Sequence, residues 1–186
     1  MSESIFFKRH SKRAYLDKTV PEDVLARLFE KIRWSPSCAN NQPWKFIFVG
    51  DNNRRAALGE ALARGNDWAK KAPVLVAVCA RKEDDYTRED DPVAYYQFDC
   101  GLAVMSLLLA AVEEGLMAHP MAGYDADKTK EALAIPDDYH VMCLISLGYE
   151  GPIVSLDERT RKKDEALRTR KEITEIISRD KFDFRE

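Results

Sequence analysis

The chain has 186 residues, of which 45% are hydrophobic and 33% charged, and 29 lysines and arginines nearly balance 32 acidic residues. This length suits one domain, or one domain with an arm, and the apolar content excludes global disorder. The net charge of -3 argues against a dedicated nucleic-acid-binding protein, which usually carries an excess of basic residues.

Two helices are predicted at the start of the chain. Ser2 or Ser4 can cap a short first helix. Thr19 and Glu22 have the spacing of a capping box for a longer second helix, whose apolar residues recur at i, i+4 and i+8. This second helix must end before Pro36.

The remaining elements follow from their apolar patterns. Strands are predicted over runs that are rich in β-branched or aromatic residues, at 44–49, 73–80 and 140–149, with a short extended piece at 117–123. Helices are predicted at 52–71 with a break near Gly65, at 93–114, at 126–134 with Asp125 as N-cap, and at 160–179. Buried strands that alternate with helices indicate a helix-covered sheet over residues 1–151. Residues 152–186 are too polar to fold alone, and we expect them to form a charged arm that packs on a partner subunit.

Several common sites are excluded by residue spacing. The four cysteines and three histidines lie far apart, so neither a disulfide framework nor a metal cluster is expected. No two of the eight glycines are separated by a single residue, which excludes GxGxxG, and neither a Walker loop nor GxSxG occurs. A phosphorylated cofactor would therefore have to be held by side chains. No signal peptide or membrane span is apparent, so we expect a soluble, cytoplasmic protein.

Two polar segments could carry function. Residues 9–13 read Arg-His-Ser-Lys-Arg, and arginine offers a planar fork that matches phosphate oxygens. Residues 35–44 form a short polar loop bounded by prolines, rich in donors and acceptors that suit a heterocycle with carbonyls and ring nitrogens. From the residues alone, a solvated basic turn and a generic helix-to-strand loop remain open alternatives.

Together with Pro120–Tyr124 and Ser146–Tyr149, these segments resemble the nitroreductase family of FMN-dependent oxidoreductases. The resemblance covers residues 4–151, with a looser match over the tail. It implies an α+β fold, in which helices flank a mainly antiparallel sheet, and an intertwined homodimer with FMN at the subunit interface.

The resemblance assigns roles to the N-terminal basic segment. Arg9 and Ser11 would contact the FMN phosphate and ribityl chain, with His10 alongside. Arg13 would lie near the pyrimidine edge of the flavin, where a fixed cation favours the negatively charged reduced form.

The loop residues would reach the isoalloxazine from the other subunit. Four positions match, namely Pro36, Ser37, Cys38 and Asn40. A serine often occupies the Cys38 position in the family, so hydrogen bonding is weakened there while van der Waals contact survives.

Further contacts are implied in the second half of the domain. Ala122 and Gly123 would pass near flavin N5; glutamate or glycine is common where Ala122 stands, so only backbone donors remain. Asn66 is a further candidate contact. A second basic contact to the phosphate is expected beyond the last strand, from Arg159 or Arg161.

The implied activity is ping-pong transfer of hydride from NADH or NADPH, through the flavin, to a small oxidant such as a nitroaromatic or a quinone. The cofactor carries the chemistry, so no side chain is expected to act as catalytic acid or base. Two alternatives remain open: a specialised flavin enzyme, such as a reductive dehalogenase or a flavin-fragmenting enzyme, and a flavin-binding module without turnover. Neither a nucleic acid nor a membrane is expected as a partner, and whether residues 81–97 form a lid is open.

Overall fold

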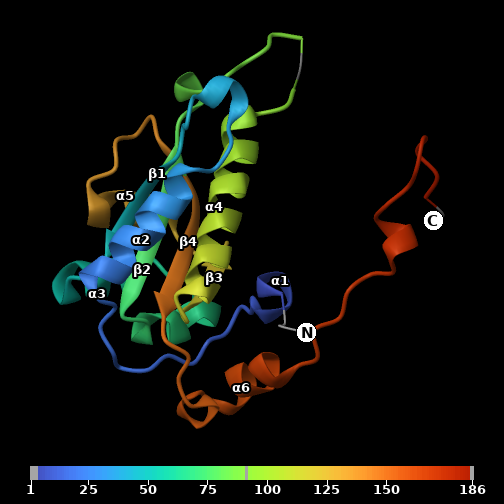
Figure 1. Ribbon diagram of the computed structural model, residues 1–186. Coiled ribbons are helices and arrows are strands. Elements are labelled where there is room, and N and C mark those ends of the chain that lie inside the picture. Colours follow the sequence, from blue (N-terminus) through green and yellow to red (C-terminus); the bar gives the residue numbers. More distant parts are fainter. Residues whose placement is uncertain (1–3, 91, 185–186) are drawn as a thin grey trace.

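A four-stranded antiparallel sheet forms the centre of the molecule (Figure 1). Its strands lie in the order β1 (Lys45–Val49), β2 (Val74–Ala80), β4 (His140–Gly148) and β3 (Met117–Met121). Every neighbouring pair is antiparallel. The computed structural model describes residues 4–90 and 92–184. The prediction of a helix-flanked, antiparallel α+β fold is confirmed.

Helices cover both faces of this sheet. One face carries α2 (Glu22–Arg33) and α4 (Tyr95–Glu113), and the other carries α3 (Asn52–Gly59), the 3-10 segment η2 (Arg64–Lys71) and α5 (Ala126–Leu133). All seven residues of β2 are buried, as its continuous apolar run predicts. Alternate side chains serve the two cores, because Val76 and Val78 pack with α2 and α4 while Leu75 and Ala77 pack with η2.

The N-terminal segment is tied to the end of β4. The Leu16 amide donates to the Tyr149 carbonyl at 3.0 Å, and the Gly151 amide donates to the Ala14 carbonyl at 2.9 Å. A Cβ at Gly151 would lie 2.4 Å from the carbonyl carbon of Tyr15, so only glycine allows this close backbone approach. The pairing places α1 (Ile5–Lys8) and α6 (Glu158–Glu165) at the same end of the molecule (Figure 1).

Within residues 4–90 and 92–184, α4 is the one helix with the length and apolar content to cross a membrane. It packs against α2 and the sheet, and the core helix of a soluble protein has the same composition.

Of the predicted helix caps, one is wrong and one is confirmed in position only. The capping box at Thr19 and Glu22 does not form, because Pro21 is still extended and is itself the N-cap of α2, which no side chain caps. Ser4 stands at the N-cap of α1 without a side-chain hydrogen bond, and Ser2 lies outside the described residues. The Asp125 cap is confirmed, since its side chain accepts from the Lys128 amide.

Two predicted helices are shorter than expected. The helix at 52–71 breaks at 60–63 rather than near Gly65, because the Ala63 amide donates to the Gly123 carbonyl instead of continuing the helix. In the tail, α6 ends at Glu165, and only a 3-10 turn (Ile173–Glu175) follows. Of the described residues after α6, all but Ser178 and Phe184 are exposed, and a polar helix with no core to pack on is marginal in water.

Candidate functional site

A cationic cavity of about 260 Å³ lies between the N-terminal segment and the start of the arm. Five of its ten lining residues are lysine or arginine, and one is acidic. The lining consists of Arg9, His10, Ser11, Arg13, Lys163, Asp164, Ala166, Leu167, Arg168 and Arg170. The structure thus brings together all four predicted residues of the N-terminal segment.

Arginine side chains from both ends of the chain meet in this cavity. Arg9 Nη1 donates to Ser11 Oγ at 3.1 Å, and Arg168 Nη1 donates to the Phe7 carbonyl oxygen at 2.6 Å. Burial, together with the charges of Arg168 and Arg170, holds the pKa of Arg9 below its usual value. Positive charge in the cavity is therefore only partly neutralised by the chain.

The positive charges around the cavity also act on His10. Its pKa is lowered by burial first and then by the charges of Arg168, Lys12 and Arg9, which outweigh the opposing effect of Asp164. A bound anion would relieve this repulsion, and arginine is suited to bind phosphate oxygens through two parallel hydrogen bonds.

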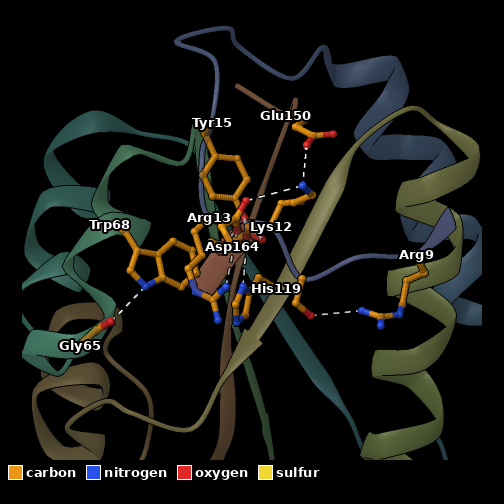
Figure 2. A network of polar contacts seen from close by, with 11 residues as sticks. Arg9, Lys12, Arg13, Tyr15, Gly65, Trp68, His119, Glu150 and Asp164 are labelled. Atoms are coloured by element: carbon orange, nitrogen blue, oxygen red, sulfur yellow. Dashed lines mark hydrogen bonds and ion pairs between the residues drawn. The ribbon is translucent and has the colours of Figure 1, made fainter. Parts of the chain in front are cut away.

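Asp164 joins α6 to the N-terminal segment (Figure 2). Its side chain is only 2% exposed and lies 3.6 Å from Lys12 Nζ and 3.5 Å from Arg13 Nη1. Lys12 also pairs with Glu150 at 3.2 Å. These contacts fix the position of α6. Arg168, which follows α6 in the chain, then lies at the cavity.

A ring cluster continues from Arg13 onto strand β3 (Figure 2). The Arg13 guanidinium lies 5.7 Å from the centre of the Trp68 ring, and Trp68 lies 4.7 Å from the His119 ring. Burial lowers the pKa of His119 to about 4, so this ring is neutral near pH 7. Its Nδ1 lies 3.1 Å from the Lys12 carbonyl oxygen and must carry the hydrogen, because a carbonyl oxygen only accepts.

Asn66 and Gly123 lie together beyond this cluster. Asn66 Nδ2 donates to the Gly123 carbonyl oxygen at 2.9 Å. A Cβ at Gly123 would lie 2.8 Å from the same Asn66 nitrogen, so any larger residue there would displace the Asn66 amide. The neighbouring Ala122 is exposed, which leaves a small, accessible surface at the end of β3.

The predicted loop residues lie elsewhere. Pro36, Ser37, Cys38 and Asn40 are at the first turns of α4, where the Cys38 amide donates to Asp99 Oδ2 at 2.7 Å. Within the described residues, none of these four lines the cationic cavity. Figure 1 shows this loop near the N-terminal end of α4 and helix α1 near the other end. A single chain therefore does not bring the two predicted segments together.

The basic residues of the arm differ from those expected. Arg159 lines a second, smaller cavity beside Trp68, and Arg161 is not among the residues that line the cationic cavity. Arg168 and Arg170 line it instead, because the chain reaches the Arg9 side only after α6 has ended. The sequence Arg-Thr-Arg-Lys occurs at both 159 and 168, and this repeat is the signal that could have identified the second pair.

A cavity of about 520 Å³, with an apolar wall, adjoins the cationic one and shares three of its arginines. Its lining consists of Phe6, Phe7, Arg9, Met105, Arg168 and Arg170. An anion next to an apolar surface matches the chemistry of a phosphorylated, ring-containing ligand.

The Nitroreductase family model matches residues 7–67 and 61–149. A Stenotrophomonas maltophilia R551-3 protein named "Putative NADH dehydrogenase/NAD(P)H nitroreductase" is 30% identical over 187 residues, covering 86% of this chain and 94% of that protein. A crystal structure described as an oxidoreductase containing FMN is 29% identical, with a TM-score of 0.88, over 100% of this chain and 94% of that one. A nitroreductase family protein from Clostridium difficile 630 is 25% identical, with a TM-score of 0.78, over 95% and 96%. The chain belongs to the nitroreductase family.

Proposed function

We propose that the protein is a cytoplasmic, FMN-dependent oxidoreductase that takes electrons from NADH or NADPH. The observation that carries the proposal is the cationic cavity, where positive charge from both ends of the chain is left for a ligand to neutralise. The solved relative that contains FMN and the relatives named NAD(P)H nitroreductases support the choice of cofactor and electron donor.

The residues present fit the phosphate of FMN. Arg9 and Ser11 lie within hydrogen-bonding distance of each other and can donate together to phosphate oxygens. Arg168 and Arg170, rather than Arg159 or Arg161, supply the second basic contact in our proposal. His10 lies beside these residues in the lining of the cavity.

The residues beyond the cavity fit the flavin ring. Arg13 is held by Asp164 and Trp68. Beside the pyrimidine edge of a bound flavin, its fixed charge would stabilise the reduced, anionic form. Asn66 and Gly123 lie together beside exposed Ala122. These residues would form the wall near N5, and backbone groups rather than a carboxylate would meet the ring.

When bound, FMN supplies hydride transfer, from NADH or NADPH to an oxidant such as a nitroaromatic or a quinone. The electron donor and the oxidant would bind over the flavin in turn, which would give ping-pong kinetics. The chain binds and orients the ring, and no side chain needs to act as acid or base.

The complete site requires a second copy of the chain. Pro36, Ser37, Cys38 and Asn40 of a second copy would contact the flavin that Arg9 and its neighbours hold in the first. A surface for this association exists, because the apolar side chains of Phe6, Phe7, Phe98 and Met105 are exposed around α1 and α4. Monomeric soluble proteins rarely expose so many large apolar residues together.

The arm after α6 would pack on the partner subunit. It carries exposed apolar side chains at Ile173, Ile176, Ile177 and Phe182. A groove of about 430 Å³ beside the edge strand β1 offers the complementary surface. It is lined by Phe29, Ile32, Arg33, Trp44, Phe46 and Phe48. An edge strand with free backbone groups readily accepts an extended segment of another chain.

The test combines absorption spectroscopy, light scattering after gel filtration and steady-state kinetics. We expect a yellow dimer that binds one FMN per chain and oxidises NADH or NADPH with menadione or nitrofurazone. A colourless monomer that does not bind added FMN would refute the proposal. A protein that binds FMN but never consumes NAD(P)H with any oxidant would be the flavin-binding module instead.

A further inference from the structure

A second cationic cavity, of about 180 Å³, is formed by residues of η2 and of the start of α6, and is hereafter the Arg159 cavity. Three cations line it, namely Arg64, Arg159 and Lys163, together with the ring of Trp68. They come from two segments that are far apart in the sequence, so the fold brings them together. The proposed function gives Arg64 and Arg159 no role, although Arg159 was expected to contact a phosphate.

The three cations have no acidic partners. Within residues 4–90 and 92–184, none of them forms an ion pair or a side-chain hydrogen bond. The two acids of the lining already have other donors, since Asp67 pairs with Lys70 at 3.3 Å and Asp157 accepts from the Thr160 amide at 3.0 Å. The positive charge of the cavity is therefore free to attract an anion.

The Arg159 cavity lies next to the proposed cofactor site. Lys163 lines both this cavity and the larger cationic one. Trp68 is shared in the same way, because its ring lies 5.7 Å from the Arg13 guanidinium (Figure 2). Trp68 Nε1 donates to the Gly65 carbonyl oxygen at 3.1 Å, which fixes the ring. A ligand in the Arg159 cavity would thus lie beside a cofactor held by the first cavity.

The lining suits a phosphate monoester. Arginine matches two phosphate oxygens with parallel hydrogen bonds, and lysine adds a point charge. A phosphate monoester carries about 1.5 to 2 negative charges at pH 7, so it gains from several cations at once. The cavity is smaller than the roughly 300–1,000 Å³ of pockets that enclose a whole small molecule. It therefore fits one phosphorylated end of a longer ligand.

We propose that the Arg159 cavity binds the 2′-phosphate of NADPH, which NADH lacks, and so makes the protein prefer NADPH as electron donor. Among the proposed ligands, FMN and NADPH carry a phosphate monoester, and that of FMN is assigned to the first cavity. Arginine accommodates the same 2′-phosphate in other nucleotide-binding folds. The choice of donor rests on the proposed function, whereas the phosphate-binding capacity of the cavity does not.

A titration without turnover tests the cavity itself. The protein, saturated with FMN where it binds FMN, is titrated with 2′-AMP and with adenosine, and the indole N–H signal of Trp68 is followed by NMR. Arg161→Ala is the matched control for Arg159→Ala, because Arg161 lies on the same helix but does not line the cavity.

We expect 2′-AMP to shift the Trp68 signal and adenosine, which has no phosphate, to leave it unchanged. Arg159→Ala should weaken 2′-AMP binding about tenfold, because one charge-assisted contact is lost. Arg161→Ala should bind 2′-AMP as the wild type does.

Steady-state kinetics with menadione then test the choice of donor. We expect the wild type to have a higher kcat/KM with NADPH than with NADH. Arg64→Ala and Arg159→Ala should each lower the value for NADPH about tenfold through KM and leave that for NADH unchanged. A residue that only supports the fold would lower both values together.

Equal use of the two donors by the wild type, or equal losses for both in Arg159→Ala, would overturn the proposal. Binding of 2′-AMP that survives Arg159→Ala would also overturn it. If the wild type binds no FMN, the proposed function fails, and the 2′-AMP titration alone decides whether the cavity binds a phosphate monoester.

Discussion

The cationic cavity and the loop formed by residues 37–42 serve one proposed site but differ in what the chain leaves unsatisfied. At the cavity, Arg9, Arg168 and Arg170 lie close together, and burial together with these like charges lowers the pKa values of Arg9 and His10. In the loop, backbone and side-chain donors already reach Asp99 and Asp85. The cavity is thus arranged to bind negative charge, whereas contacts within the chain hold the loop in one conformation.

The two regions also depend on different supports. The cavity forms only where the N-terminal segment meets both the end of β4 and the arm, contacts that are more than 130 residues apart in sequence. The loop depends on α4 and on the segment before it. Variants can therefore separate the two supports, and those with the largest expected effect act on the cavity.

The largest effect is expected from Gly151→Ala. The added Cβ would meet the Tyr15 backbone at 2.4 Å, so the pairing of residues 14–16 with 149–151 must shift. We expect a loss of about 3 kcal/mol in the free energy of unfolding, measured in urea, together with weaker FMN binding. Gly50→Ala is the control, because its Cβ would have no atom within 4 Å. Equal stability of the two variants would show that the cavity does not depend on this pairing.

Arg9→Ala addresses the charge of the cavity. Removal of one charge-assisted contact should cost about 2 kcal/mol, or roughly thirtyfold in FMN affinity, and leave riboflavin affinity unchanged. Arg159→Ala is the matched control, since this arginine lies at a different cavity on the same arm. Flavin fluorescence titration measures both, and unchanged FMN affinity in Arg9→Ala would remove Arg9 from the site.

A smaller effect is expected from His119, which supports the cavity through Lys12. Its folded pKa of about 4 lies below the ordinary 6.5, so its contribution to stability is complete above pH 6.5 and is lost as the pH falls toward 4. Allowing for partial exposure, we expect a loss of about 1.5 kcal/mol over that window. His119→Gln should flatten this part of the pH profile, and an unchanged profile would assign the acid sensitivity to other groups.

The sequence predicts the sheet and most helices because their signals are local. The apolar run of β2 and the all-round apolar pattern of α4 require burial in almost any fold. The limits of the helix at 52–71 were not predictable, because they depend on the hydrogen bond from the Ala63 amide to the distant Gly123 carbonyl. The helix predicted at 160–179 ends early for a related reason. The apolar side chains of the described tail are exposed within a single chain, so no core stabilises a longer helix there.

The candidate site was predictable in part. The basic pattern at residues 9–13 identified the N-terminal side of the cavity, because arginine and serine at that spacing suit an anion. The arm side could not be assigned from spacing, since Arg159 and Arg168 begin the same four-residue sequence and only the path of the chain after α6 separates them.

The most direct test of the central claim compares the affinities of FMN and riboflavin for the wild-type protein. The two ligands share the ring and the ribityl chain and differ by the phosphate, so their ratio isolates what the cationic cavity contributes. We expect FMN to bind at least about a hundredfold more tightly, because its phosphate gains two or more charge-assisted hydrogen bonds. Equal affinities would show that the arginines do not hold a phosphate and would contradict the account.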